Sequence, residues 1–192
     1  MSEHLIGVIS DTHGLLRPEA VAALRGVEQI IHAGDVGRPE ILTDLARIAP
    51  VRAVRGNVDR GEWAEALPLT EVVTVGGLLL YVLHDRHALD LNPAAAGFAA
   101  VISGHSHQPL VEQRGPVLYL NPGSAGPRRF RLPVSLAHLI VRDGALTAES
   151  ILASVREGRT FRRTWAGIRW SRSCRPRSIY RWRRRCRRGS RR

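Results

Sequence analysis

The residues best suited to chemistry in this sequence are aspartates, histidines and one asparagine, each placed directly after a short apolar run. His105 and His107 follow the run AAVI (99–102) and lie two positions apart. Side chains at positions i and i+2 of an extended chain point to the same side, so both imidazoles could face one site. Imidazole nitrogen is a common ligand of borderline divalent metals, and this spacing favours a metal centre.

The same arrangement follows four other apolar runs. It places Asp11 and His13 after LIGVIS (5–10), Asp35 after QIIHAG (29–34), Asn57 after VRAVRG (51–56) and His84 after LLLYVL (78–83). In a sheet rich in parallel strands the carboxyl ends share one edge, where open α/β folds usually hold their sites. One such residue alone is more often a cap or a turn residue, but five runs together predict a shared site. Seven ligands are too many for one zinc-like ion, which takes about four, and suit two ions that share a carboxylate.

The elements that must position these residues alternate between strands and helices. The five runs above, with VLYLNPG (117–123), are apolar, bounded by turn formers and typical of buried strands. Helix-like segments begin near Pro18 and Pro39, and the order strand, helix, strand predicts parallel pairing in an α/β layer fold. Gly76-Gly77 and Asp143-Gly144 lie between apolar runs and predict hairpins. The sheets are therefore expected to be mixed, with two sheets packed together.

Composition divides the chain into two parts. The 192 residues are 44% hydrophobic, which suits a globular domain with a real core. No apolar run approaches the ~20 residues of a membrane helix, and the first 15 residues lack the pattern of a signal peptide, so we expect a cytoplasmic protein. Residues 1–158 hold 14 arginines and 17 acidic residues, whereas residues 159–192 hold 15 arginines and no acid. We predict a domain over 1–158 and an Arg-rich, disordered tail over 159–192.

Three interpretations of the tail stay open. It contacts nucleic acid or acidic lipid weakly through its charge, it is an inert extension, or it is a reading-frame artefact of a GC-rich gene. Phe161, Trp165 and Ile168 have helical spacing, which indicates one or two amphipathic turns. Cys174 and Cys186 also lie in the tail, so a metal site in the domain must use nitrogen and oxygen ligands. Oligomeric state is left open.

The ordered motifs DTH, GD, GNVD, the strand-ending His84, GHSH and NPGS resemble those of the calcineurin-like metallophosphoesterases. More narrowly, they resemble the small bacterial and archaeal phosphodiesterase subfamily, which is similar in fold to the vacuolar-sorting subunit of retromer. The resemblance covers roughly residues 1–153. It implies an α/β fold in which two mixed β-sheets form a sandwich flanked by helices, in four αββα layers.

The resemblance also implies a role for each ligand-type residue. One ion would be held by Asp11, His13 and His107 and the other by Asn57, His84 and His105, with Asp35 bridging the two. The implied function is a binuclear, metal-dependent phosphodiesterase in which a metal-bridging hydroxide attacks phosphorus, and no further catalytic residue is assigned. We expect two divalent ions, with manganese as the first choice and iron, zinc, nickel and cobalt as alternatives, because these ligand types permit all of them.

The expected substrate is a small phosphodiester or a nucleotide-like molecule, and the sequence does not identify it further. Val58 stands where nuclease-type relatives have a histidine that protonates the leaving group, so esters with good leaving groups should react best. Asp85 stands where relatives usually have a glycine after the ligating histidine. His87 and Ser124 are weaker candidates for contact with substrate.

Two further expectations concern function and the core. The alternative function is a non-catalytic protein-interaction scaffold of the same fold, and the complete set of ligands favours the enzyme over it.

His32 lies in its strand with parity opposite to Asp35, so it is expected to support the site from the core rather than to bind metal.

Overall fold

The computed structural model describes residues 3–129, 131–153 and 160–169. Strands and short helices alternate in its first half, and strands alone follow. The elements in chain order are β1 (Glu3–Ile9), α1 (Pro18–Ala23), β2 (Gln29–His32), α2 (Pro39–Ala46), β3 (Val51–Ala53), α3 (Glu62–Glu65), β4 (Thr70–Val75), β5 (Leu78–Leu83), the 3-10 helix η1 (Arg86–Ala88), β6 (Phe98–Ile102), β7 (Leu110–Arg114), β8 (Val117–Asn121), β9 (Val134–Arg142), β10 (Ala145–Ala153) and β11 (Thr160–Arg169).

Two mixed sheets make up the fold. The first has the strand order β11-β10-β9-β1-β2-β3, and the second has the order β4-β5-β6-β8-β7. Parallel pairs join β1 to β2 and β2 to β3 in the first sheet, and β5 to β6 and β6 to β8 in the second. Each sheet therefore has a parallel part, and the remaining pairs are antiparallel. The predicted pair of mixed sheets is confirmed.

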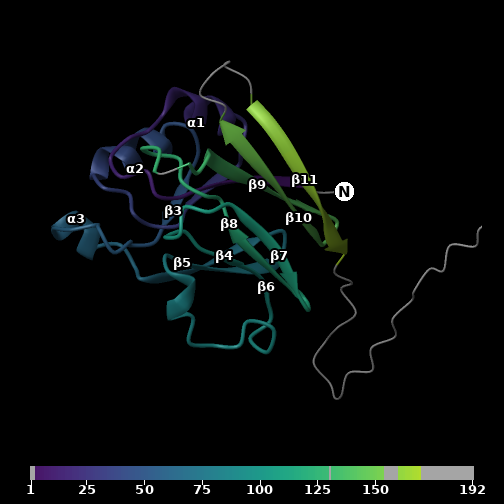
Figure 1. Ribbon diagram of the computed structural model, residues 1–192. Coiled ribbons are helices and arrows are strands. Elements are labelled where there is room, and N and C mark those ends of the chain that lie inside the picture. The colour runs from purple at the N-terminus through teal and green to yellow at the C-terminus, as the bar shows by residue number, and fades with distance from the viewer. Residues whose placement is uncertain (1–2, 130, 154–159, 170–192) are drawn as a thin grey trace, which may run out of the picture.

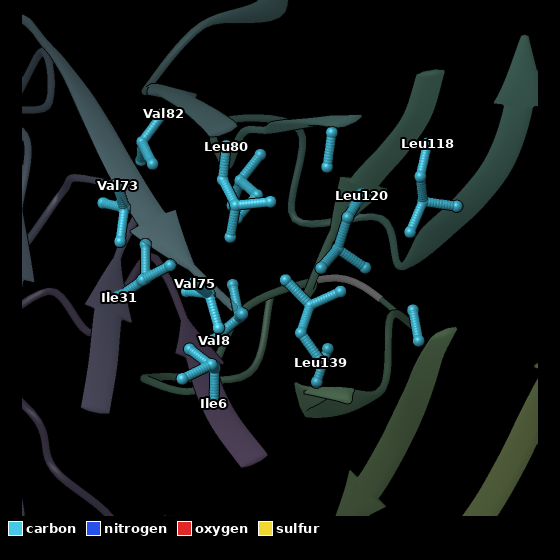
Figure 2. Packing of buried hydrophobic residues seen from close by; sticks show 14 of the residues in the cluster. Ile6, Val8, Ile31, Val73, Val75, Leu80, Val82, Leu118, Leu120 and Leu139 are labelled. Carbon is cyan, nitrogen blue, oxygen red and sulfur yellow. The ribbon is translucent and has the colours of Figure 1, made fainter. Parts of the chain in front are cut away.

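The main core lies between the two sheets. Figure 2 shows Val8, Ile31 and Leu139 of the first sheet directed toward side chains of the second sheet, among them Leu80 and Leu120. All five are almost completely removed from solvent. Burial of such apolar surface is the largest favourable contribution to folding, and alternation along each strand is what directs these side chains to the inner faces.

The outer faces of the two sheets are covered differently. Leu24, which caps the C-terminal end of α1, packs with Ile9 and Ile30 of the first sheet, as do Ile41 and Leu45 of α2. Figure 1 shows these two helices on the same side of the molecule. On the second sheet a separate apolar cluster is covered by the segment around η1, through Leu89 and Leu91. The fourth layer of the predicted sandwich is thus a loop with one 3-10 turn rather than a long helix.

The two predicted hairpins are confirmed. Gly76-Gly77 joins β4 to β5 and Asp143-Gly144 joins β9 to β10, and all four residues have positive φ. Two such residues in succession give the turn that matches the twist of paired strands. Strand β7 was not predicted because LVEQR lacks an apolar run, and this strand lies at an edge of its sheet.

Strand β11 lies in the segment that the sequence assigns to the tail. Its backbone pairs antiparallel with β10 from Ala153↔Thr160 to Ala145↔Arg169. The amphipathic turns predicted there are therefore wrong, since the backbone is extended. Without β11, β10 would be an edge strand with unpaired N–H and C=O groups, and a following segment that pairs with them satisfies those groups. The predicted boundary at residue 158 lies outside the described residues, as do residue 159 and residues 170–192 of the predicted disordered tail (159–192), so both stay predictions.

No helix in the described part of the chain is long and apolar enough to span a membrane.

Candidate metal centre

The predicted ligands meet where strand ends of the two sheets face each other. Asp11, which follows β1 of the first sheet, lies 3.2 Å from His107, which follows β6 of the second. Asp35, after β2, lies 3.3 Å from His84, after β5. The sequence predicted convergence at one sheet edge, and the structure divides the ligands between two sheets.

Asp11, His13 and His107 form the first cluster, and their ligand atoms all lie within 4.8 Å of one another. The Nε2 atoms of His13 and His107 are 3.3 Å apart, and His107 Nε2 is 3.2 Å from Asp11 Oδ1. This carboxylate oxygen is fully buried and accepts no hydrogen bond from the described residues. A buried charge without partners is costly, whereas a cation bound between a carboxylate and two imidazoles would offset that cost. The residues present therefore fit a metal ion.

Asn57, His84 and His105 form the second cluster. Asn57 Oδ1 lies 3.0 Å from His84 Nε2 and 3.0 Å from His105 Nδ1. Asp11, Asp35 and His84 also have ligand atoms within 4.8 Å of one another. The second cluster thus offers two imidazoles and a neutral amide oxygen, and it adjoins two carboxylates.

Asp35 lies between the two clusters. Its Oδ1 is 3.3 Å from His84 Nε2, and its Oδ2 is 3.8 Å from His13 Nε2. One oxygen is therefore directed to each cluster, which is the arrangement that a bridging carboxylate requires. The side chain is almost completely buried, so it can hold this orientation.

Hydrogen bonds behind the ligands fix their orientation. His84 Nδ1 lies 2.8 Å from the carbonyl oxygen of Ala33. A carbonyl only accepts, so Nδ1 carries a proton and donates it to Ala33. Nε2 is thereby the ring atom directed to the site, where it donates to Asp35 when the ring is protonated and would present its lone pair to a bound ion. Asp11 Oδ2 accepts from Ser10 Oγ at 2.6 Å and from the His105 amide at 3.1 Å. Ser10 is a supporting residue that the sequence did not single out, although its place next to Asp11 at the strand end was a signal.

The backbone at the ligands is unusual. Six non-glycine residues in the described part of the chain have positive φ, and five of them are predicted ligands: Asp11, His13, Asp35, His105 and His107. Such conformations cost on the order of 1 kcal/mol or more each and concentrate at functional sites. His105 and His107 do face one site as predicted, but the reason given for it is wrong. Their backbone is left-handed rather than extended, because β6 ends at Ile102.

Two glycines allow the close approach of these loops. A Cβ atom at Gly56 would lie 2.0 Å from the amide nitrogen of Asp35, and one at Gly104 would lie 1.9 Å from Ser10 Oγ. Neither position accepts a side chain without moving an element of the site. Both glycines precede predicted ligands directly, in the GN and GH motifs.

Opposing effects set the charge of the buried groups. Burial alone would raise the pKa of Asp35, but hydrogen bonds from His84 and the Val58 amide outweigh it and lower the pKa. Burial alone would lower the pKa of His84, but the bonds to Asp35 and the Ala33 carbonyl outweigh it and raise the pKa. Burial, followed by the positive charge of Arg129, lowers the pKa of His13. Asp35 is thereby held in the ionised form that binds metal.

Residues 5–144 match the model of the calcineurin-like phosphoesterase superfamily domain. The chain belongs to this superfamily. Among its curated relatives, a probable metallophosphoesterase of Methanothermobacter thermautotrophicus is 39% identical over 159 residues, which cover 77% of this chain and 91% of the relative. Phosphodiesterase YfcE of Escherichia coli K12 is 30% identical over 76% of this chain and 94% of its own.

Solved structures confirm the calcineurin-like phosphoesterase fold. Vacuolar Protein Sorting 29 from Cryptosporidium parvum superposes with a TM-score of 0.74 at 18% identity, covering 88% of this chain and 99% of that one. Wild-type Vps29 of Entamoeba histolytica complexed with Zn²⁺ superposes with a TM-score of 0.70 at 23% identity, covering 83% and 98%. At this level of identity the likeness concerns the fold alone.

The two remaining candidates for substrate contact have different surroundings. Ser124 is buried, and its hydroxyl donates to the carbonyl oxygen of Asp11 at 3.0 Å. It therefore supports the loop that carries Asp11, and the geometry offers no support for a contact with substrate. His87 is exposed on η1, where its amide donates to Asp85 Oδ1 at 2.9 Å. Its contact with substrate stays a prediction. Asp85 Oδ2 lies 4.0 Å from His105 Nε2.

His32 occupies the supporting position that its strand parity predicted. It is fully buried, and its Nε2 lies 2.9 Å from Thr12 Oγ1, between Asp11 and His13. The Thr12 hydroxyl donates to the Val36 carbonyl, so it accepts from the imidazole. Burial lowers the pKa of His32 to about 4. The ring is therefore neutral at physiological pH.

Proposed function

We propose that this protein hydrolyses phosphodiester bonds with the help of two divalent metal ions. The observation that carries the proposal is the position of Asp35, which directs one carboxylate oxygen to each of two ligand clusters. Membership of the phosphoesterase superfamily supports it, as does the 30% identity to a protein named as a phosphodiesterase.

The chain's own residues would divide the work as follows. Asp11, His13 and His107 would hold one ion, and Asn57, His84 and His105 the other, with Asp35 shared. Bound ions of this kind lower the pKa of water toward neutrality and compensate charge on phosphoryl oxygens. The Ala33 carbonyl keeps His84 in the tautomer that this role needs. Manganese is the ion that we propose first, and the nitrogen and oxygen donors also suit iron, zinc, nickel and cobalt.

Val58 limits the range of substrates. Its amide donates to Asp35 at 3.0 Å, which directs the residue to the site, but its side chain has no proton to give. A leaving group of high basicity would have to take its proton from water. Phosphodiesters with stable leaving groups, such as aryloxides, are therefore the proposed substrates.

A non-catalytic scaffold of the same fold is the alternative. Its support is the structural likeness to Vps29, which at 18% identity concerns the fold alone. A scaffold has no need for a buried carboxylate oxygen without a hydrogen-bond partner, or for five left-handed ligand residues. Those features favour the enzyme.

The test is hydrolysis of bis-p-nitrophenyl phosphate by the full-length, metal-stripped chain as Mn²⁺ is added back. The full chain is used because β11 completes the first sheet beyond residue 158. Asp35→Asn should reduce kcat/KM by more than about 100-fold, beyond the range typical of outer-shell partners. The control is Asp90→Asn, at an exposed position outside both clusters. Folded protein without turnover in Mn²⁺, Fe²⁺, Zn²⁺, Ni²⁺ or Co²⁺ would favour the scaffold.

A further inference from the structure

A pocket adjoins the metal centre on the side of β3 and α3. Its volume is about 330 Å³, and its lining includes Arg55, Asn57, Arg60, Ala64, Glu65 and Leu69. Asn57 belongs to the pocket and also to the second ligand cluster. A phosphodiester with its phosphorus at the metal centre would therefore have one ester arm next to this pocket.

Neither arginine of the pocket has a carboxylate partner in the described part of the chain. Arg60 donates there to the backbone carbonyl of Asp59, at 3.1 Å. Among the described residues, the Arg55 guanidinium makes no hydrogen bond or ion pair. Arg47, by contrast, is paired with Asp44 at 2.7 Å. Two unpaired guanidinium groups on one pocket leave their charge available for a ligand.

Asp59 and Glu65, the acidic residues of the lining, do not occupy the guanidinium groups. Asp59 is buried, and its two carboxylate oxygens each accept a backbone amide at 2.8 Å, from Gly37 and from Gly56. Glu65 lines the pocket but lies within ion-pair distance of neither arginine in the part of the chain that the structure describes. The lining thus holds two acidic residues and two arginines, but in the described part of the chain neither carboxylate is paired with a guanidinium group, so the donors of both arginines are available for a ligand.

The rest of the lining is partly apolar. Ala64 and Leu69 belong to the pocket, and Leu69 is 63% exposed. Apolar surface beside unpaired cations is complementary to an organic group that carries an anion, rather than to a free inorganic ion.

We propose that this pocket binds a second phosphate carried by one arm of the phosphodiester substrate. Guanidinium groups suit phosphate because their donors match two oxygens at once, and the apolar wall would contact the part of the arm between the two phosphates. The proposal rests on the proposed phosphodiesterase function and narrows it to substrates with two phosphate groups.

The test compares two chromogenic substrates that differ by one phosphate. They are the 5′-p-nitrophenyl phosphate ester of thymidine and the same ester with a 3′-phosphate, each given to the full-length protein in Mn²⁺. The wild type should prefer the second by roughly 10-fold or more in kcat/KM, the effect of one or two charged hydrogen bonds. In the double variant Arg55→Gln, Arg60→Gln the ratio should approach 1. The matched control Arg47→Gln removes a charge outside the pocket and should keep the wild-type ratio.

Equal kcat/KM values for the two substrates in the wild type would overturn the proposal, and so would a preference that survives in the double variant. If instead the proposed phosphodiesterase function is wrong, neither substrate will be hydrolysed, so the two negative results can be told apart. In that case calorimetry decides. Thymidine 3′,5′-bisphosphate should bind roughly 10-fold more tightly than thymidine 5′-monophosphate, and the double variant should lose the difference. Equal affinities would overturn the proposal.

Discussion

His84 and His32 are both buried close to the metal centre, and their partners give them opposite charge preferences. The two ring nitrogens of His84 form hydrogen bonds to the Asp35 carboxylate and the Ala33 carbonyl. These hydrogen bonds outweigh burial and raise the pKa of His84. His32 faces a threonine hydroxyl, and burial lowers its pKa to about 4. Desolvation opposes charge in both, and only a charge partner reverses the outcome.

The first prediction concerns the pH dependence of stability. The pKa of His32 is about 4 in the fold against 6.5 in the unfolded chain, so the unfolded state binds its proton more readily. Its stabilising contribution is complete above about pH 6.5 and is lost as pH falls toward 4. Between pH 8 and pH 5 this loss is about 2 kcal/mol of unfolding free energy. In His32→Gln the amide can still donate to Thr12 but cannot titrate. The free energy of unfolding, measured with urea, should therefore decrease less between pH 8 and pH 5 than in the wild type.

The exposed His87 provides the control, because His87→Gln should keep the wild-type pH dependence. If the free energy of unfolding decreased equally between pH 8 and pH 5 in His32→Gln and in the wild type, the assignment of a neutral, buried His32 would be contradicted.

At the scale of elements, the loops after β6 and β8 support each other. Asn121, the last residue of β8, donates to the Gly104 carbonyl at 2.6 Å and to Ser106 Oγ at 3.1 Å. Its own Oδ1 accepts the Gly123 amide at 2.9 Å. The loop that carries His105 and His107 is thus connected to the neighbouring strand by one buried side chain.

Asn121→Ala should weaken metal binding as well as stability. Three hydrogen bonds are lost and buried polar groups are left unpaired, which costs about 2 to 4 kcal/mol of unfolding free energy. The loop of His105 and His107 loses its support, so Mn²⁺ affinity should fall about 10- to 100-fold. Urea unfolding and calorimetric titration measure the two effects.

Asn92→Ala is the matched control. The Asn92 side chain is exposed and accepts the amides of Ala94 and Ala95 at 3.1 and 3.2 Å, in a turn outside both ligand clusters. The free energy of unfolding of this variant should fall by at most about 1 kcal/mol, and its Mn²⁺ affinity should equal that of the wild type. If a folded Asn121→Ala protein also bound Mn²⁺ as the wild type does, the supporting role of Asn121 would be wrong.

At the scale of the whole molecule, the candidate metal centre takes its ligands from both sheets. Asp11, His13, Asp35 and Asn57 follow strands of the first sheet, and His84, His105 and His107 follow strands of the second. An ion held by ligands from both sheets binds the folded protein far more tightly than the unfolded chain, so binding and folding are coupled.

Mn²⁺ should therefore stabilise the whole domain. At a free concentration 100 times the dissociation constant, the free energy of unfolding should rise by about 3 kcal/mol per site. Asp35→Asn should lose most of this gain, because Asp35 adjoins both clusters, and the exposed Asp90→Asn should retain it. Urea unfolding with and without Mn²⁺ gives the values. The same gain in Asp35→Asn as in the wild type would show that the ions bind elsewhere.

The sequence by itself determined the strands that end in ligands, the two hairpins and the order of the motifs. These features are local, because the alternation of apolar residues and the turn residues act over a few positions. They do not depend on which strands pair with each other. Seven ligand-type residues could be named because each closely follows one of five strands.

The tertiary structure alone decided which sheet each ligand belongs to, the left-handed backbone at five of them, the pairing of β11 with β10 and the pocket of Arg55 and Arg60. Each of these depends on contacts between segments far apart in the chain. Residue periodicity places a side chain on one face of its own strand, but it carries no information about which other strand will lie opposite.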